Sequence, residues 1–299
     1  MAQALTALIF PGQGSQYVGM DHPVRQHPAA QAVLTRAGAV LGEEAMDRIG
    51  RGPAAELNQT LHAQPALLAM SIAHLAAWRE IDQTPVAMLA GHSAGQYAAA
   101  VAAEAIEFED ALLLIQARAR LMSQAVAGGM VAVLGLPQTQ LKPLISAARE
   151  YGEIGLANDN SPGQIVLAGI VEAVAAVPQL ATAAGARRTV VLPINVASHS
   201  PLMRRVRIEL AAQLESVAIQ SPRLPIMSNL RAELVSDADR LRFELAQHLV
   251  RPVRWRSAVE KMIKLGIGHF IEVGPGRVLT GLVRRIDGAS DVRALDQEA

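Results

Sequence analysis

Short apolar runs alternate with helical stretches along the first third of the chain. Residues 5–10 and Pro85–Ala90 each form a nearly continuous apolar run, which is typical of a strand buried on both faces of a parallel sheet. Tyr97–Ala103, just after the second run, is mostly alanine and predicts a helix that packs closely on that sheet. Helical stretches such as Gln64–Trp78 fill much of the interval between the two strands. This alternation of strand and helix predicts an α/β fold.

The pattern changes at about residue 127, where strands begin to follow one another with only a turn between them. The predicted order is strand, helix, strand, strand, helix, strand, which is the order of a ferredoxin-like unit. The strands are expected at Met130–Leu136, Glu153–Ala157, Gln164–Ala168 and Arg188–Pro193, the helices at Pro137–Tyr151 and Val171–Ala184, and a turn at Asn160–Gly163.

The α/β pattern resumes after residue 193. We expect a strand at Leu224–Ser228, a helix at Ala258–Leu265, a strand at His269–Val273 and a glycine turn at Gly274–Gly276. The chain is therefore predicted to have a large α/β domain made of residues 1–126 and 194–299. A small ferredoxin-like subdomain, residues 127–193, interrupts it.

The segment Gly91-His92-Ser93-Ala94-Gly95 lies between a predicted strand and a predicted helix. A G-x-S-x-G sequence in this context is the pattern of a nucleophile elbow, in which glycines allow a sharp turn that holds a serine in a strained conformation. The helix that follows directs its first N–H groups at the turn, which favours a developing oxyanion. Ser93 is thus a candidate nucleophile; a purely structural turn is the alternative.

A nucleophilic serine needs a base, and the chain has eight histidines. His199 follows the last small-subdomain strand, in a loop where the chain rejoins the large domain, and such loops and junctions are where α/β proteins place their sites. From the residues alone, His199 is either the base or a capped loop histidine. Serine before histidine is the chain order of α/β-hydrolases, so we predict that the large domain is α/β-hydrolase-like.

Composition removes several other classes of function. The 27 basic and 27 acidic side chains balance, and only nine residues are aromatic, so nucleic acid is not an expected partner. There is no cysteine, which excludes disulfides and thiol chemistry. No apolar run approaches the ~18 residues of a membrane span, and the first run does not look like a signal peptide. We therefore expect a cytoplasmic protein without a membrane partner.

Several motifs in one order make the chain resemble malonyl-CoA:acyl carrier protein transacylases, a family that includes related acyltransferases of polyketide synthesis. The resemblance extends almost from end to end. It is carried by Phe10-Pro11-Gly12-Gln13-Gly14-Ser15-Gln16, Gln64-Pro65-Ala66, Gly91-His92-Ser93, Arg118 with Met122, Asn160-Ser161-Pro162-Gly163-Gln164, Ser198-His199, Pro252-Val253-Arg254-Trp255 and Glu272-Val273-Gly274-Pro275-Gly276.

This resemblance implies roles for the catalytic residues. Ser93 would be the nucleophile and His199 its base, and the main-chain N–H groups of Ala94 and Gln13 would bind the oxyanion. In the family a main-chain carbonyl orients the histidine, and the resemblance maps that carbonyl to Arg254. A carbonyl can fix the tautomer by accepting the Nδ1 proton, which leaves Nε2 free to take the serine proton.

Arg118 lies in the mostly apolar helix Ala111–Gln124. The residue pattern allows a surface arginine, a structural ion pair, or a partly buried guanidinium that binds an anion. The resemblance implies the third: Arg118 would hold the malonyl carboxylate. Gln64 and Asn160 are then expected to line the pocket. His92 adjoins the nucleophile on a tight turn, and from that position it is expected to line the pocket as well.

The implied reaction is a ping-pong transfer of malonyl from CoA, through an acyl-serine, to the phosphopantetheine thiol of an acyl carrier protein. No permanently bound cofactor and no metal are expected, and the protein is expected to be a monomer. Arg187 and Arg188 are candidates for docking an acidic carrier; a solvated face is the alternative.

Two departures from the family pattern keep other functions open. Gln96 stands where the family usually has glutamate, and Ala119 where it commonly has glycine. The alternatives are a polyketide trans-acyltransferase with another acyl group, an acyl hydrolase, a malonyl transferase subunit of a malonate decarboxylase, and an interaction subunit with a degenerate site.

Overall fold

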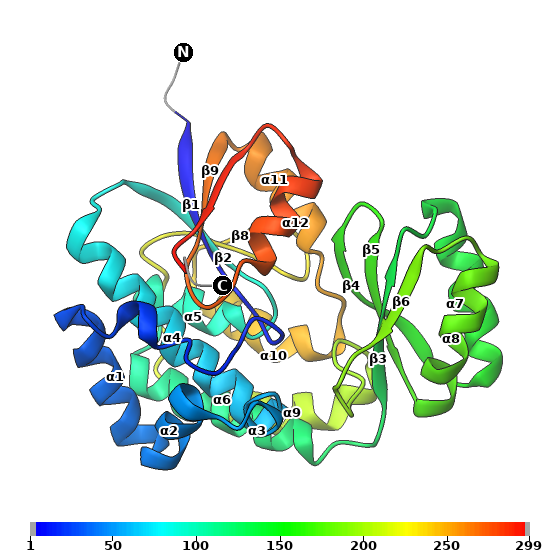
Figure 1. Ribbon diagram of the computed structural model, residues 1–299, viewed down its shortest axis with the longest axis horizontal. Helices are drawn as coiled ribbons and strands as arrows, with labels where there is room; N and C mark the ends of the chain where they lie inside the picture. Colours follow the sequence, from blue (N-terminus) through cyan, green and yellow to red (C-terminus); the bar gives the residue numbers. More distant parts are fainter. Residues whose placement is uncertain (1–3, 297–299) are drawn as a thin grey trace.

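The computed structural model describes residues 4–296, which form two separate β-sheets with helices packed on them (Figure 1). The larger sheet has six strands in the order β10-β9-β1-β2-β7-β8, and its neighbouring strands are parallel except for the β7–β8 pair. Its strands are β1 (Leu5–Phe10), β2 (Val86–Gly91), β7 (Ile226–Met227), β8 (Leu234–Val235), β9 (Ile267–Glu272) and β10 (Asp291–Ala294).

The larger sheet is buried on both faces, and β1 shows how the sequence achieves this. Leu8 and Phe10 pack into one hydrophobic cluster, whereas Ala7 and Ile9 pack into another on the opposite face, because successive side chains of a strand point to opposite sides. The first cluster is covered by α1 (Pro28–Leu41), α4 (Thr60–Ile81), α5 (Gly95–Ala102), α6 (Phe108–Ser123), α9 (Arg204–Glu215) and α10 (Ala238–Gln247), and the second by α11 (Trp255–Lys264) and α12 (Val278–Ile286). The short helices α2 (Glu43–Arg51) and α3 (Ala54–Leu57) lie beside α4.

The smaller sheet is antiparallel throughout and has the order β4-β5-β3-β6, which is the predicted ferredoxin-like arrangement. Helices α7 and α8 cover its outer face (Figure 1), while Met130 and Val166 on the other face border the cavity described below. The elements are β3 (Gly129–Leu134), α7 (Leu141–Ala148), β4 (Ile154–Ser161), β5 (Gln164–Gly169), α8 (Val171–Ala183) and β6 (Arg188–Val191).

The chain enters and leaves the small-sheet region at adjacent points. Ala127 and Val196 form an antiparallel bridge, and the Gly128 N–H donates to the Asn195 carbonyl at 3.1 Å. All four strands of the small sheet fall between these two points. The division into residues 1–126 with 194–299 and residues 127–193 stays a prediction about folding units.

One local expectation for the small-sheet region is confirmed and one is wrong. The segment predicted to be helical over Pro137–Tyr151 is helical from Gln138 to Tyr151, as a 3-10 turn, the α-helix α7 and a second 3-10 turn. Pro143 lies within the first turn of α7, where the missing N–H of a proline is tolerated. The turn predicted to begin at Asn160 is shorter, since β4 continues to Ser161 and only two residues remain between the strands. Asn160 is therefore a strand residue.

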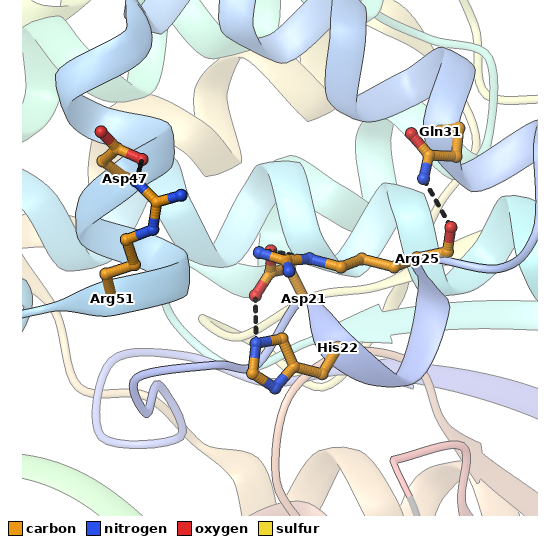
Figure 2. Close-up of polar contacts among 6 residues, drawn as sticks. All are labelled: Asp21, His22, Arg25, Gln31, Asp47 and Arg51. Carbon is orange, nitrogen blue, oxygen red and sulfur yellow. Dashed lines mark hydrogen bonds and ion pairs between the residues drawn. The ribbon is translucent and has the colours of Figure 1, made fainter.

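The segment that leads into α1 is held by polar contacts around the Asp21 carboxylate (Figure 2). Arg25 Nε donates to this carboxylate at 2.7 Å, and His22 Nε2 lies 4.0 Å from it. Gln31 Nε2 in turn donates to the Arg25 carbonyl at 2.5 Å. These contacts fix the start of α1, and none of these residues borders the cavity described below.

Candidate active site

Ser93 lies in the turn between β2 and α5 and has a backbone φ of +53°. Gly91 and Gly95 are required because neighbouring main-chain atoms lie too close to leave room for a side chain at either position. A Cβ on Gly91 would lie 2.1 Å from the main chain of Gly95, and a Cβ on Gly95 would lie 2.2 Å from the Phe10 carbonyl oxygen. The turn is thus pressed between its own helix and β1, and it presents Ser93 at the carboxyl end of the parallel strands.

Ser93 and His199 are hydrogen-bonded, with Ser93 Oγ 2.8 Å from His199 Nε2. His199 Nδ1 lies 2.6 Å from the main-chain carbonyl oxygen of His248. Because a carbonyl can only accept, the proton of neutral His199 is on Nδ1, and the Nε2 lone pair faces the serine hydroxyl. This is the tautomer that a general base needs.

The carbonyl that orients His199 is that of His248, so the prediction of Arg254 is wrong. The Arg254 carbonyl accepts the Ala258 N–H at 2.9 Å, because Arg254 is the residue immediately before α11 and begins its hydrogen-bond ladder. His248 begins the short 3-10 helix η5 (His248–Val250), which directly follows α10. Carbonyls near the end of a helix lack an intrahelical partner, and this one is available to His199.

His199 is held in its neutral form. Burial, followed by the positive charge of Arg118, lowers its pKa to about 3, and the hydrogen bond to the His248 carbonyl offsets only part of this shift. The unprotonated base is therefore the resting state at neutral pH.

Two main-chain N–H groups lie beside the serine, those of Ala94 and Gln13, and the structure records no protein acceptor for either within residues 4–296. The loop that carries Gln13 reaches the elbow because it has a glycine before it: a Cβ on Gly12 would lie 2.4 Å from the His92 carbonyl oxygen. Gln13 is anchored from its side chain, whose Nε2 donates to Thr60 Oγ1 at 3.2 Å. The arrangement can bind an oxyanion.

Asn229 and Glu244 support the elbow and were not predicted. Asn229 Oδ1 accepts the Ser93 N–H at 2.9 Å, and its Nδ2 donates to the Gly91 carbonyl at 2.7 Å. The buried carboxylate of Glu244 accepts the Asn229 N–H at 2.6 Å, and burial raises the pKa of that carboxyl. The available signal was the position of Asn229, a polar residue just past the carboxyl end of a parallel strand.

Arg118 is 1% exposed and has no carboxylate partner among the described residues. Its two terminal nitrogens donate to neutral acceptors: Nη1 to Gln64 Oε1, and Nη2 to His248 Nε2 at 3.2 Å. The guanidinium also lies 5.9 Å from the centre of the Tyr97 ring. Burial lowers the pKa of Arg118. A buried guanidinium in this state favours the binding of a ligand carboxylate.

His92 joins the elbow to the small sheet. Its Nε2 lies 2.8 Å from Asn160 Oδ1 on β4, and its ring meets the Trp255 ring edge-on at 5.5 Å. Burial lowers the pKa of His92, so the ring is neutral. The ring is one wall of the cavity that Ser93 also lines.

One cavity collects most of the predicted site residues. Its volume is about 160 Å³, below the ~300–1,000 Å³ typical of pockets for drug-sized ligands, and it therefore suits a short acyl group. The predicted residues that line it are Gln13, Gln64, His92, Ser93, Ala94, Arg118, Asn160 and His199, and Ser198 lines it as well.

Arg187 and Arg188 do not line this cavity. Both are exposed, at the start of the edge strand β6, and Arg187 packs over Gly135. The chain reaches the cavity at Leu192, four residues after Arg188, which corresponds to roughly 13 Å of extended chain.

Across residues 4–296, no helix is long and apolar enough to cross a membrane. The same residues include no group of three or more histidine, aspartate or glutamate side chains arranged to bind a metal ion.

The chain matches the family model described as "Acyl transferase domain" over residues 7–294. It is similar to malonyl CoA-acyl carrier protein transacylases of two bacteria. With that of Escherichia coli it shares 39% identity over 97% of this chain and 96% of the relative. With that of Bacillus subtilis it shares 38% identity over 94% of this chain and 90% of the relative.

Two solved structures show the same fold over nearly the whole chain. One is a malonyl-transacylase in complex with its type II PKS acyl-carrier protein, with a TM-score of 0.93, 37% identity, and coverage of 97% of this chain and 96% of that one. The other is the acyl-carrier-protein-S-malonyltransferase of Bartonella henselae, with a TM-score of 0.94, 34% identity, and coverage of 98% and 96%.

Proposed function

The chain belongs to the acyl transferase domain family, and from this membership we propose that it transfers malonyl groups from CoA to the phosphopantetheine thiol of an acyl carrier protein. The observation that carries the proposal is a cavity lined both by a serine–histidine pair and by a buried arginine that has no carboxylate partner within residues 4–296. The pair supplies the chemistry of acyl transfer, and the arginine supplies a reason to choose a dicarboxylic acyl group.

The first half-reaction acylates Ser93. As Oγ attacks the thioester carbon, His199 Nε2 accepts the hydroxyl proton, and the Oγ–C bond forms while the C–S bond breaks. His199 then returns the proton to the departing CoA thiolate. Orientation by the His248 carbonyl suits both steps, since it keeps Nε2 directed at the reacting atoms.

Negative charge develops on the acyl carbonyl oxygen during each half-reaction, first that of the thioester and then that of the acyl-serine ester. We assign its binding to the N–H groups of Ala94 and Gln13, which have no acceptor among the described residues and belong to residues that line the same cavity as Ser93. One such donor is typically worth about 3 kcal/mol in the transition state.

The acyl group is selected by Arg118, in this proposal through a pair of hydrogen bonds to the malonyl carboxylate. Binding that carboxylate would neutralise a buried cation for which the described part of the chain provides no anion. Gln64 holds the guanidinium, while His92 and Asn160, in contact with each other, line the same cavity. An acetyl group offers no anion and would leave the arginine uncompensated.

The second half-reaction returns the acyl group to a thiol. The phosphopantetheine sulfur attacks the acyl carbon as its proton passes to His199 Nε2, and Ser93 Oγ leaves and takes that proton back. An acyl carrier protein is the bound partner in the structural neighbour described above, which supports a carrier as the acceptor here. We keep Arg187 and Arg188 as candidate docking residues, since both are exposed and precede Leu192, which lines the cavity, by only a few residues of chain.

The remaining expectations stand as parts of the same proposal. The protein would act as a monomer in the cytoplasm, with no permanently bound cofactor and malonyl-CoA only as substrate. Tolerance of substituted malonyl groups would depend on the space beside Ser198, which lines the cavity.

The test is intact-protein mass spectrometry after mixing with malonyl-CoA, acetyl-CoA or a longer acyl-CoA, followed by addition of holo carrier protein. We expect one malonyl adduct on the wild type, none on Ser93→Ala, and movement of the adduct to the carrier. An adduct that is hydrolysed before the carrier is added would favour an acyl hydrolase. Preference for another acyl group would favour a trans-acyltransferase of different specificity.

Reversing the charge of both Arg187 and Arg188 tests the docking role. Transfer to the carrier should fall while malonyl-CoA hydrolysis is unchanged. An equal effect on both reactions, or none, would remove these residues from the interface.

A further inference from the structure

His248 contacts both the base His199 and the buried Arg118, although it does not line the cavity. Its carbonyl orients the base, as described above, and its side chain is a second and separate contact. Nε2 of the ring lies 3.2 Å from Arg118 Nη2, and the ring is fully buried, edge-on to Tyr97 with the ring centres 6.2 Å apart. The inference drawn from this side chain rests on the proposed function.

The contact with Arg118 fixes the state of the imidazole. A guanidinium has only donors, so His248 Nε2 must accept and the ring proton must lie on Nδ1. Nδ1 has no hydrogen-bond partner within residues 4–296. Burial, and then the nearby charge of Arg118, lower the pKa of His248 well below its ordinary value, which agrees with a neutral ring.

A neutral acceptor at position 248 leaves the charge of Arg118 available to a ligand, whereas a carboxylate there would not. Both protein groups bonded to the Arg118 guanidinium, Gln64 and His248, orient it without cancelling its charge. An Asp or Glu at 248 would form an internal ion pair and compete with a ligand carboxylate. An apolar side chain would leave Nη2 unpaired and free to turn.

We propose that the His248 side chain is a positioning residue for acyl-group selection: its Nε2 holds Arg118 Nη2 so that the guanidinium stays aimed into the cavity with its charge available. Because the same residue orients His199 through its carbonyl, one short segment aligns the base and the carboxylate-binding arginine with each other. One residue at the start of η5 thus positions both the group that selects the substrate and the group that acts as the base.

Three variants separate the side-chain role from general packing. Every one keeps the main-chain carbonyl, so differences between substrates report on the ring. His248→Leu should lower kcat/KM for malonyl-CoA by about 10–100-fold, mainly through KM, and that for acetyl-CoA by about threefold or less. His248→Gln supplies a neutral oxygen acceptor and should keep kcat/KM for malonyl-CoA within about threefold of the wild-type value. His248→Glu should lower kcat/KM for malonyl-CoA more than His248→Leu does.

A double-mutant cycle with Arg118→Ala tests whether His248 acts through the arginine. In the Arg118→Ala background, His248→Leu should change the malonyl-to-acetyl ratio by about twofold or less, because the group that it positions is gone. Thermal unfolding of each variant shows whether it is folded.

The proposal is overturned if His248→Leu lowers the malonyl and acetyl reactions equally, if His248→Gln fails to restore the malonyl reaction, or if the two substitutions are additive. Failure of the proposed function is a different result, since the wild type would then form no malonyl adduct on Ser93. A wild type that accepts malonyl, with variants that leave selectivity unchanged, would refute the positioning role alone.

Discussion

At the residue scale, both reacting residues have a left-handed backbone conformation, with φ of +53° at Ser93 and +61° at His199. Such a conformation costs a non-glycine residue roughly 1–2 kcal/mol. Asn229 holds the first by bonding the Ser93 N–H and the Gly91 carbonyl, and two hydrogen bonds hold the second through the His199 ring. The strain lies in the backbone of the two residues that react, and the hydrogen bonds to their neighbours keep it in place.

The lowered pKa of His199 predicts an unusual pH profile. A base with a pKa of about 3 remains unprotonated as the pH falls through 6.5, so activity should persist on the acid side. With malonyl-N-acetylcysteamine, which has no phosphate groups, kcat/KM should fall by less than about twofold between about pH 7.5 and 5.5. A histidine of ordinary pKa would lose about tenfold over the same interval.

The control for this profile is thermal unfolding at each pH, since a loss of folded protein would imitate titration of the base. An acid limb with an apparent pKa close to 6.5, in protein that stays folded, would contradict the assignment of His199 as a buried neutral base.

At the element scale, the turn from β2 to α5 carries the nucleophile, and Gln96 is part of how that turn is built. In the sequence, Gln96 is a departure from the glutamate that is usual in the family. The structure shows a function for it: the buried amide accepts the Gly91 N–H at 2.9 Å and donates to the Met227 carbonyl at 3.1 Å. Gln96 therefore ties β2 to β7, and the donor is a group that glutamate lacks when ionised.

Gln96→Glu is accordingly predicted to lower the free energy of unfolding by about 1–3 kcal/mol at about pH 8, because a buried carboxylate would face the Met227 carbonyl and lie near Glu244. Urea denaturation measures the change. The matched control is Gln59→Glu, an exposed glutamine just before α4, which should change stability by less than about 0.5 kcal/mol. A Gln96→Glu protein as stable as the wild type would show that the donor contact is unimportant.

The elements that the sequence predicted well are those whose signal is local. The apolar runs identified β1 and β2, and the glycines identified the turn at Ser93, because burial on two faces and close approach restrict residue type directly. The strand expected at Leu224–Ser228 has only two paired residues, Ile226–Met227, since its length depends on how far β2 and β8 extend alongside it. Such pairing is not visible in one segment.

The site residues also differ in whether a local sequence signal identifies them. The side chains that react could be predicted, and the structure brings Ser93, His199 and Arg118 to one cavity. The carbonyl that orients His199 was misplaced at Arg254, because every residue has a carbonyl and nothing in the sequence distinguishes the one left free at the start of η5. The paired roles of His248 follow from the same tertiary contacts.

At the scale of the whole molecule, the cavity lies where the two sheets meet, and a main-chain contact fixes their relation. Val253, just before α11, exchanges hydrogen bonds with the edge of β4: its N–H donates to Ala157 at 2.8 Å, and its carbonyl accepts from Asp159 at 2.9 Å. Figure 1 shows β4 facing α11 and α12. This contact covers an otherwise free strand edge and holds the small sheet against the elbow.

The bond from His92 to Asn160 completes this junction at the cavity. Asn160→Ala should lower kcat/KM for malonyl-CoA by about 5–100-fold, since His92 would lose its partner and the wall would loosen. Gln164→Ala is the control, because it removes the Arg285–Gln164 contact between the same two parts of the molecule but away from the cavity. It should change kcat/KM by less than about twofold. Equal effects of the two variants would argue against a specific role for the cavity wall.

The most direct test of the whole account is the rate of acylation of Ser93, measured by quenched flow and mass spectrometry with malonyl-CoA and with acetyl-CoA. We predict that the wild type reacts faster with malonyl-CoA by about 10²–10⁴-fold, and that Arg118→Ala removes most of this preference by slowing the malonyl reaction. Equal rates for the two substrates in the wild type, or a preference for malonyl-CoA that survives Arg118→Ala, would contradict the claim that the unpaired buried arginine selects the acyl group.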